Sequence, residues 1–302
     1  MHDLGNSEVF HITRQTINFE SCENLQNFIV PEQLRHALED IEALADLADA
    51  KNDISIAEVA YNRAIDWYRA LGPEVKQPRQ NLLRKVGRFY EKTGQKDQAE
   101  LCYSKIFEDL SLADYTDIHY PLHHAIRNFN PKDQLTHDAL MGIIRCCPPC
   151  RFKLRNGKLQ TPLYLAVYAA KEEAIVAIMV RLRDPRRQFR IDSLHLDARD
   201  SGGQTILTTA ILSMCSLPLI NSLIKYGSNV NPEIWDGPYT ALQAASIPGS
   251  ERIDVACLLI LHHANPDYVF RDSTVAELMA NNGVPERVDV PLFPELDPPP
   301  DA

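Results

Sequence analysis

The residues most suited to chemistry are three cysteines and three histidines that lie near one another in the sequence. The cysteines are Cys146, Cys147 and Cys150, and the histidines are His119, His123 and His124. A structural zinc site needs four ligands that converge tetrahedrally, usually as two spaced pairs. Cys146 and Cys147 instead end an apolar helical stretch, where small buried thiols are common. We therefore predict structural cysteines and no bound metal, with a zinc site and a reactive thiol as the alternatives.

Other catalytic patterns are missing from the sequence. It contains no G-x-S-x-G nucleophile elbow, no H-E-x-x-H and no G-x-G-x-x-G after a strand. Residues 92–96 are only faintly similar to a phosphate-binding loop, because Gln95 stands where the lysine must be. We therefore predict that the chain is not an enzyme and binds no cofactor. An enzyme that has recruited a binding groove is the catalytic alternative.

Composition bounds the class of protein. The 302 residues suffice for about two domains, and 45% hydrophobic with 24% charged residues excludes wholesale disorder. No stretch approaches the ~18 apolar residues that span a membrane, and the first residues lack the pattern of a secretory signal. The seven cysteines have no framework spacing, which is typical of reduced thiols. We therefore predict an intracellular protein, cytoplasmic or nuclear, with no membrane association.

Charge is distributed unevenly along the chain. The net charge of −10 disfavours general nucleic-acid binding, but residues 127–190 hold thirteen basic and five acidic residues. Two interpretations are open for this segment: a solvated surface whose charges pair between neighbouring units, or a patch for an acidic partner. For the second, a protein partner is favoured, because Phe152 and Phe189 are too few aromatics for a base-stacking platform.

Between about residues 38 and 113, large, small and aromatic residues recur at helical spacing on two helices. The clearest copy consists of Leu83, Val86, Gly87, Tyr90, Gly94, Ala99, Tyr103 and Ile106. Gly87 and Ala99 are small where one helix must approach the other closely, and the helices break at Gly94.

This pattern resembles a tetratricopeptide repeat within residues 80–113. A weaker earlier copy has Asn52 in its turn and Asp53 as the cap of its second helix. The resemblance implies a tetratricopeptide-like helical module over residues 31–113. Residues 1–30 carry no repeat signature and are predicted to form an N-terminal arm.

A second type of repeat follows, with four similar helix starts. They lie at residues 120–125, 161–166, 205–210 and 240–245. Proline in the first turn favours a helix start, and threonine just before it can cap the helix. Each start is followed by a second apolar helix, and two of these helices continue into Asn-rich turns.

These residues resemble ankyrin repeats over about residues 115–283. Thr161-Pro162-Leu163 matches the helix start of that family, and residues 227–231 match its turn. The resemblance also implies that the imidazole of His123 bridges backbone groups between loops.

The two resemblances together imply an all-α fold, a helical repeat solenoid with tetratricopeptide-like hairpins followed by an ankyrin stack with short β-hairpin loops. The second resemblance implies an ankyrin-repeat domain over residues 114–283, with a degenerate fifth unit at 272–279 as its cap. Residues 284–302 contain six prolines and are predicted to be a disordered tail. The combination resembles the repeat regions of large fungal ankyrin proteins.

The ankyrin resemblance implies binding of a partner protein through the concave face and loops, without an intrinsic reaction. We therefore expect a non-catalytic interaction scaffold or adaptor. Nucleic-acid or acidic-partner binding through residues 127–190 is the alternative. In the ankyrin-like register, the resemblance implies that the partner-binding residues are Asp117, His119, Arg127, Lys158, Gln160, Tyr168, Ser201, Gln204, Leu212, Asp236 and Tyr239. An exposed Tyr168 beside Leu212 would suit the anchor of an interface, unless it packs between adjacent units.

Overall fold

The computed structural model confirms the predicted all-α class, because helices make up nearly all of the regular structure that it describes. It describes residues 31–71, 75–108, 120–183, 195–232, 240–247, 252–265, 269–270 and 273–274. The predicted arm over residues 1–30 and the predicted tail over 284–302 lie outside these ranges.

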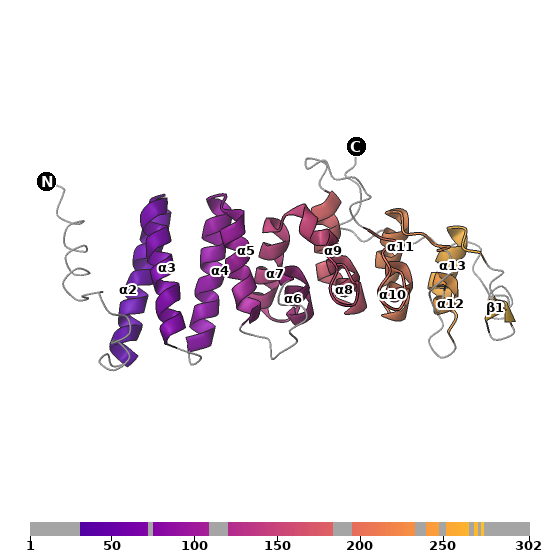
Figure 1. The fold of residues 1–302 in the computed structure, drawn as a ribbon, viewed down its shortest axis with the longest axis horizontal. Helices are drawn as coiled ribbons and strands as arrows, with labels where there is room; N and C mark the ends of the chain where they lie inside the picture. The colour runs from indigo at the N-terminus through magenta and orange to yellow at the C-terminus, as the bar shows by residue number, and fades with distance from the viewer. Residues whose placement is uncertain are drawn as a thin grey trace. The chain divides into compact units, whose positions relative to one another are not determined.

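The described helices follow one another in pairs joined by short turns (Figure 1). Helices α6, α8, α10 and α12 begin at the four starts predicted from the sequence. In chain order the elements are α2 (Pro31–Ala50), α3 (Ile54–Ala70), α4 (Lys76–Lys92), α5 (Lys96–Glu108), α6 (Pro121–Asn128), α7 (Gln134–Cys146), the 3-10 helix η3 (Pro149–Lys153), α8 (Pro162–Tyr168), α9 (Glu172–Arg183), α10 (Ile206–Leu212), α11 (Leu217–Lys225), α12 (Ala241–Ala245), α13 (Ile253–Leu261), β1 (Val269–Phe270) and β2 (Ser273–Thr274).

The chain divides into two compact units, residues 1–74 and 75–302. The sequence grouped α4 and α5 with the hairpin before them, in one module over residues 31–113. Both helices belong instead to the second unit, because α5 packs against α6 and α7 and α4 packs against α7. The predicted boundary after residue 113 lies outside the described residues.

In the first unit, α2 packs against α3. Two tyrosines of α3 donate hydrogen bonds to carboxylates of α2: Tyr61 to Asp46 at 2.8 Å and Tyr68 to Glu42 at 2.7 Å. Asp53 caps the start of α3 by accepting a backbone N–H, as predicted. These bonds fix the two helices of the hairpin to each other.

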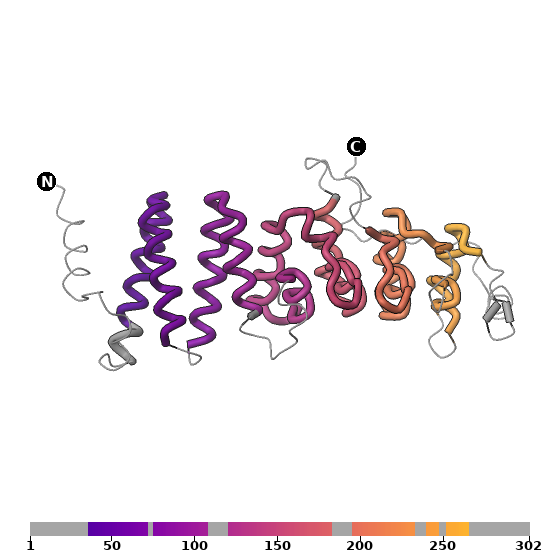
Figure 2. Tube along the Cα trace, in the orientation of Figure 1, coloured from indigo at the N-terminus to yellow at the C-terminus, as the bar shows by residue number. Residues whose placement is uncertain are grey.

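In the second unit, each helix pair packs on the next pair along the chain (Figure 2). Helix α6 contacts α8, α8 contacts α10 and α10 contacts α12, while α7 contacts α9 and α11 contacts α13. A leucine and an alanine recur at the same two positions of α6, α8, α10 and α12, and all eight side chains are buried. They are Leu122 and Ala125, Leu163 and Ala166, Leu207 and Ala210, and Leu242 and Ala245. The same side chains therefore form the core from pair to pair.

Among the described helices, six end in the same hydrogen-bonded turn: α2, α4, α8, α10, α11 and α13. The N–H of the second residue beyond the cap donates to a carbonyl five residues earlier, which satisfies a helix-end acceptor. The residue before that donor adopts a left-handed conformation with φ between 51° and 103°. These left-handed residues are Asn52, Gly94, Ala170, Met214, Gly227 and His263.

A short hairpin is the last described part of the chain. Strand β1 pairs antiparallel with β2, and Val269 lies opposite Thr274. Ser273 and Thr274 fall within the fifth unit predicted at residues 272–279, and the remainder of that unit lies outside the described residues.

Candidate partner-binding surface

The loops before α8 and α10 have the same local structure and lie against each other. In each loop a side-chain Oδ1, of Asn156 or Asp200, accepts backbone N–H groups from the residues two and four positions later, at 2.9–3.0 Å. The N–H of Ser201 donates to the carbonyl of Lys158 in the neighbouring loop at 2.9 Å. The structure therefore brings together two predicted partner-binding residues, Lys158 and Ser201, and both side chains are exposed.

Threonine caps orient the first helix of three successive pairs. The hydroxyls of Thr161, Thr205 and Thr240 each accept the backbone N–H three residues later, at 3.1–3.3 Å. All three threonines are buried, so the caps belong to the core between pairs. This confirms the predicted capping role of threonine.

The end of α8 and the turn after α10 expose three large apolar side chains. Tyr168 is 57% exposed, Leu212 is 37% exposed and Met214 is 60% exposed. The Ser213 hydroxyl donates to the carbonyl of Tyr168 at 3.3 Å, so the ends of α8 and α10 adjoin. We call Tyr168, Leu212 and Met214 the turn surface.

The exposure of Tyr168 and Leu212 agrees with their predicted positions. Tyr168 was also considered as a residue packed between adjacent pairs, but more than half of its side chain is accessible. Of the other predicted residues, Arg127 and Gln204 are partly buried. Those outside the described residues are Asp117, His119, Asp236 and Tyr239.

Gln160 was predicted to be an exposed contact, and this is wrong because it is only 2% exposed. Its backbone N–H donates to Asn156 Oδ1 at 3.0 Å, and its side-chain Oε1 lies 3.3 Å from Asn156 Nδ2. Its carbonyl lies 2.9 Å from Nε2 of the buried His123. His123 therefore joins α6 to the loop before α8 through one backbone group, whereas the ankyrin resemblance implied a bridge between backbone groups of loops.

The cysteines lie in surroundings that disfavour the thiolate. Burial, followed by the carboxylate of Glu91, raises the pKa of Cys146 to about 12. Burial also raises the pKa of Cys147 to about 12, whereas Cys150 is exposed. Since nucleophilic attack uses the thiolate, neither buried thiol is prepared for this reaction. Within the described residues, no group of three His, Cys, Asp or Glu side chains is arranged to hold a metal ion.

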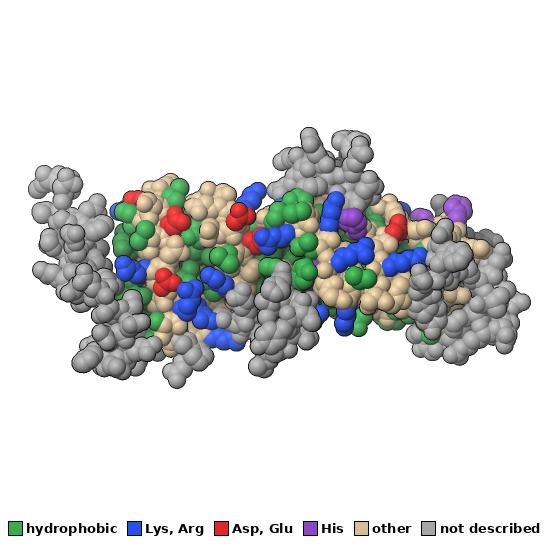
Figure 3. Space-filling model, viewed as in Figure 1, with side chains coloured by type: hydrophobic (Ala, Val, Ile, Leu, Met, Phe, Trp, Pro, Cys, Tyr) green, Lys and Arg blue, Asp and Glu red, His purple; other side chains and the backbone are tan. Residues whose placement is uncertain are grey.

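Part of the positive charge in residues 127–190 is used in contacts within the fold. Arg145 pairs with a carboxylate of α4 at 3.1 Å, and Arg151 pairs with one of α5 at 2.6 Å. Lys171 and Arg181 donate to backbone carbonyls of the preceding helix pair at 2.9 and 3.0 Å. The contacts of these four residues therefore agree with the first interpretation, in which the charges of this segment are satisfied by neighbouring units. Other Lys and Arg side chains are exposed. In Figure 3 several of them lie beside a histidine, in the region of the view between α9 and α11.

No protein-family model matches the chain, and no curated protein matches it. In the part of the chain that the structure describes, no helix is both long and apolar enough to cross a membrane.

Met214 was not among the residues predicted from the sequence. It lies nine positions after the start of its repeat, as Ala170 does in the preceding pair, and both residues adopt left-handed conformations. The predicted binding positions included Tyr168 and Leu212, which lie seven residues after the threonine caps, but not the residue two positions later. Its signal was a large apolar residue at a position where glycine is usual after a helix end.

Proposed function

We propose that this chain is a non-catalytic interaction scaffold or adaptor that binds a partner protein through the turn surface and the adjoining loops. The observation that carries the proposal is the exposure of Tyr168, Leu212 and Met214 at neighbouring helix ends. Aromatic residues dominate the energetics of protein interfaces, and methionine adapts to varied apolar partners. A contiguous set of such side chains fits a protein-binding role better than a solvated surface.

The residue type at position 214 gives further support. Its φ of 56° is a conformation that costs a non-glycine residue about 1–2 kcal/mol. A glycine would relieve this strain, yet the position carries a long apolar side chain that is 60% exposed. Asn52, Ala170 and His263 adopt the same conformation at the equivalent turn position, so the support comes from the long exposed side chain of Met214, which a binding contact explains.

We further propose that the architecture is a repeat solenoid, with tetratricopeptide-like hairpins followed by an ankyrin-like stack. The recurring buried leucine and alanine, the threonine caps and the contact from His123 to Gln160 support the second part. The burial of Gly87, Ala99 and Tyr103 supports the first. Repeat folds of both kinds present surfaces assembled from successive units, as the turn surface is.

The non-catalytic part of the proposal rests on how the reactive groups are held. The thiols of Cys146 and Cys147 have a pKa near 12, and the imidazole of His123 is occupied by the carbonyl of Gln160. The free cysteines of the described residues also fit an intracellular, reducing compartment.

The test is affinity capture followed by identification of bound proteins, with wild type compared to Tyr168→Ala and Met214→Gly. A direct partner is expected to be lost or weakened by both variants, with a loss of more than about 1 kcal/mol for Tyr168→Ala when measured with purified partner. Met214→Gly is informative because glycine suits the left-handed backbone there, so lost binding with unchanged thermal melting is attributed to the missing side chain.

Val180→Ala is the matched control, because Val180 is 44% exposed on α9 and lies outside the turn surface. Partners that are retained equally by wild type, Tyr168→Ala and Met214→Gly would contradict the proposed surface. Earlier melting of Tyr168→Ala with unchanged binding would show that Tyr168 is a packing residue.

A further inference from the structure

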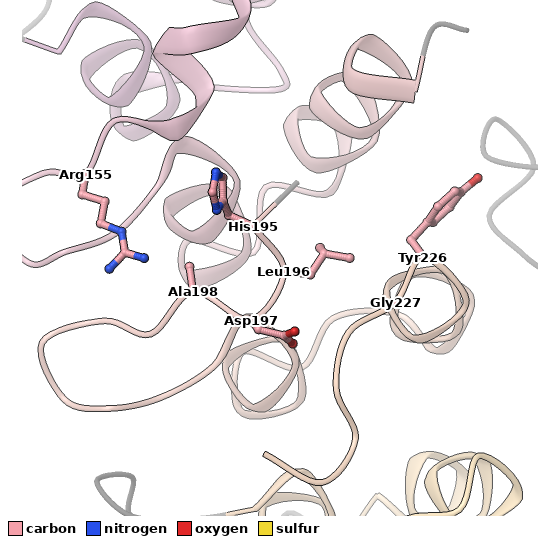
Figure 4. A pocket seen from close by; sticks show the side chains of 7 residues that line it. All are labelled: Arg155, His195, Leu196, Asp197, Ala198, Tyr226 and Gly227. Atoms are coloured by element: carbon pink, nitrogen blue, oxygen red, sulfur yellow. The ribbon is translucent and has the colours of Figure 1, made fainter. Parts of the chain in front are cut away.

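A hollow of about 550 Å³ lies on the second unit, away from the residues of the turn surface. Arg155 lines it from the loop before α8, residues 195–198 line it from the turn before α10, and Tyr226 and Gly227 line it from the end of α11. Figure 4 shows the side chains of Arg155 and Tyr226 on either side of the turn that carries His195. Because three separate segments build it, the hollow exists only when neighbouring helix pairs are packed together.

Three exposed cations lie in the segment that contributes Arg155 to this hollow. Lys153 is the last residue of η3, Arg155 and Lys158 lie on the loop that follows, and all three are exposed. Lys153 and Arg155 are near enough to His195 that, after burial, their charges are the causes that lower its pKa. Within the described residues, no carboxylate forms an ion pair with any of these three side chains. They differ in this from Arg145 and Arg151, which are paired with carboxylates of the fold.

The nearby carboxylates are already occupied by the backbone. Asp197 accepts the N–H of Asn229 at 2.9 Å, and Asp200 accepts two N–H groups of its own loop. The Nε2 atom of the neighbouring His195 is solvent-shielded and has no hydrogen-bond partner among the described residues. Among the described residues, the Arg155 guanidinium therefore has no carboxylate partner in the hollow, while Asp197, the acid that lines it, is held by the backbone of Asn229.

We propose that this hollow binds an acidic segment of the partner protein, with Arg155 as the principal contact to a glutamate or aspartate side chain. Arginine is suited to this role because its planar guanidinium can hold a carboxylate through two hydrogen bonds. Lys153 and Lys158 add positive charge that steers an acidic segment to the same loop. This inference rests on the proposed function, since it names the chemistry of part of the same partner.

A protein segment fits the hollow better than nucleic acid. A duplex presents a phosphate charge about every 1.7 Å along its axis, and such a continuous row would meet Asp197, which is exposed at the hollow. Phe152, the aromatic residue on the adjoining 3-10 helix, is 3% exposed and is not available for base stacking. An acidic peptide can place single carboxylates at Arg155 and keep apolar residues beside Asp197.

The test is fluorescence anisotropy with a fluorescein-labelled, glutamate-rich peptide, its matched peptide with glutamine at each glutamate, and a labelled DNA duplex. Wild type is expected to bind the glutamate peptide more tightly than the glutamine peptide. The double variant Lys153→Glu with Arg155→Glu is expected to weaken this binding by about tenfold or more. Both residues are exposed, so thermal melting should be unchanged and will show that the variant is folded.

Lys132→Glu is the matched control, because Lys132 is exposed in the same basic segment but does not line the hollow. Loss of binding by Lys132→Glu equal to that of the double variant would overturn the proposal, as would equal binding of the two peptides or absence of binding by wild type. Tighter binding of the duplex, lost in the double variant, would also overturn it in favour of a nucleic-acid site. Tyr168→Ala should leave peptide binding unchanged, so failure of the hollow and failure of the turn surface can be distinguished.

Discussion

The ring of Tyr103 on α5 lies so close to the backbone of Gly142 on α7 that a Cβ at position 142 would overlap the ring. On α4, a Cβ built on Gly87 would lie 2.6 Å from Cε1 and Cζ of the same ring. Tyr103 is therefore enclosed between two glycines from different helix pairs. This contact explains why α4 and α5 form one compact unit with the helices that follow them.

We expect Gly142→Ala to lower the free energy of unfolding by about 1–3 kcal/mol, because the added methyl must displace the buried Tyr103 ring. The measurement is chemical denaturation of the full chain. Gly157→Ala is the control: a Cβ there meets no atom within 4 Å, and the change should be nearly neutral. Equal stability of Gly142→Ala and wild type would mean that the ring can move aside freely.

A second link between α4 and α7 is sensitive to pH. Asp138 lies 3.1 Å from Arg84 and 2.6 Å from Arg88. Although partial burial favours the neutral acid, a hydrogen bond from Gln134 and the two arginines hold the pKa of Asp138 below its usual value. Because the folded state favours the ionised form, this group stabilises the fold above the unfolded pKa of about 3.9. That stabilisation is lost as the pH falls through the lower pKa of the folded state.

We therefore expect Asp138→Asn to melt earlier than wild type at neutral pH, with a difference that narrows as the solution is acidified below about pH 4. Melting temperatures measured in parallel across this range provide the check. Asp97→Asn, a change at an exposed carboxylate of α5, is the comparison and should have little effect. A wild-type advantage that persists undiminished in strong acid would argue against an ionic role for Asp138.

The parts of the fold that could be predicted from the sequence depend on local interactions. Thr161 and Thr205 cap their helices by accepting a backbone N–H three residues away. Gly87 lacks a side chain because the Tyr103 ring of the neighbouring helix packs against its backbone, and its helical spacing indicates such a close approach. Capping and close helix approach within one hairpin involve neighbours in sequence, so their signals appear in short motifs.

The parts that could not be predicted depend on contacts between pairs. Gln160 is buried because it is held by Asn156 and by His123 from the preceding helix pair, and its spacing alone carries no sign of this. The grouping of α4 and α5 with the second unit depends on the contact of Tyr103 with Gly142. The hollow at Arg155 is assembled from three segments that are distant in sequence. The sequence therefore indicates a basic segment at residues 127–190 but does not predict the hollow.

For the cysteines, we expect a thiol reagent at neutral pH to label Cys150 rapidly in the folded protein, since its side chain is exposed. Cys146 and Cys147 should react only on unfolding, because burial raises the pKa of both thiols. Replacing all three with alanine or serine should change stability modestly and leave metal content unchanged. Stoichiometric zinc in the purified protein that disappears in the triple variant would reverse this interpretation.

Substitutions at equivalent helix-end turns can be compared within one unit. Gly94, with φ of 81°, and Met214, with φ of 56°, occupy the same position after α4 and α10. Since the left-handed conformation costs a non-glycine residue about 1–2 kcal/mol, Gly94→Ala should lower the free energy of unfolding by about 1 kcal/mol. Met214→Gly should raise it by up to about 1 kcal/mol, because relief of strain exceeds the greater entropy of glycine in the unfolded chain.

Ala170→Gly is the internal comparison, because Ala170 has φ of 51° but no long side chain. Denaturation of the three variants separates backbone strain from side-chain packing. If Met214→Gly loses stability while Ala170→Gly gains it, the Met214 side chain stabilises the fold itself. That outcome would contradict its role as a partner contact. If both gain stability, methionine at position 214 is retained against the preference of the backbone, as expected for a residue that contacts a partner.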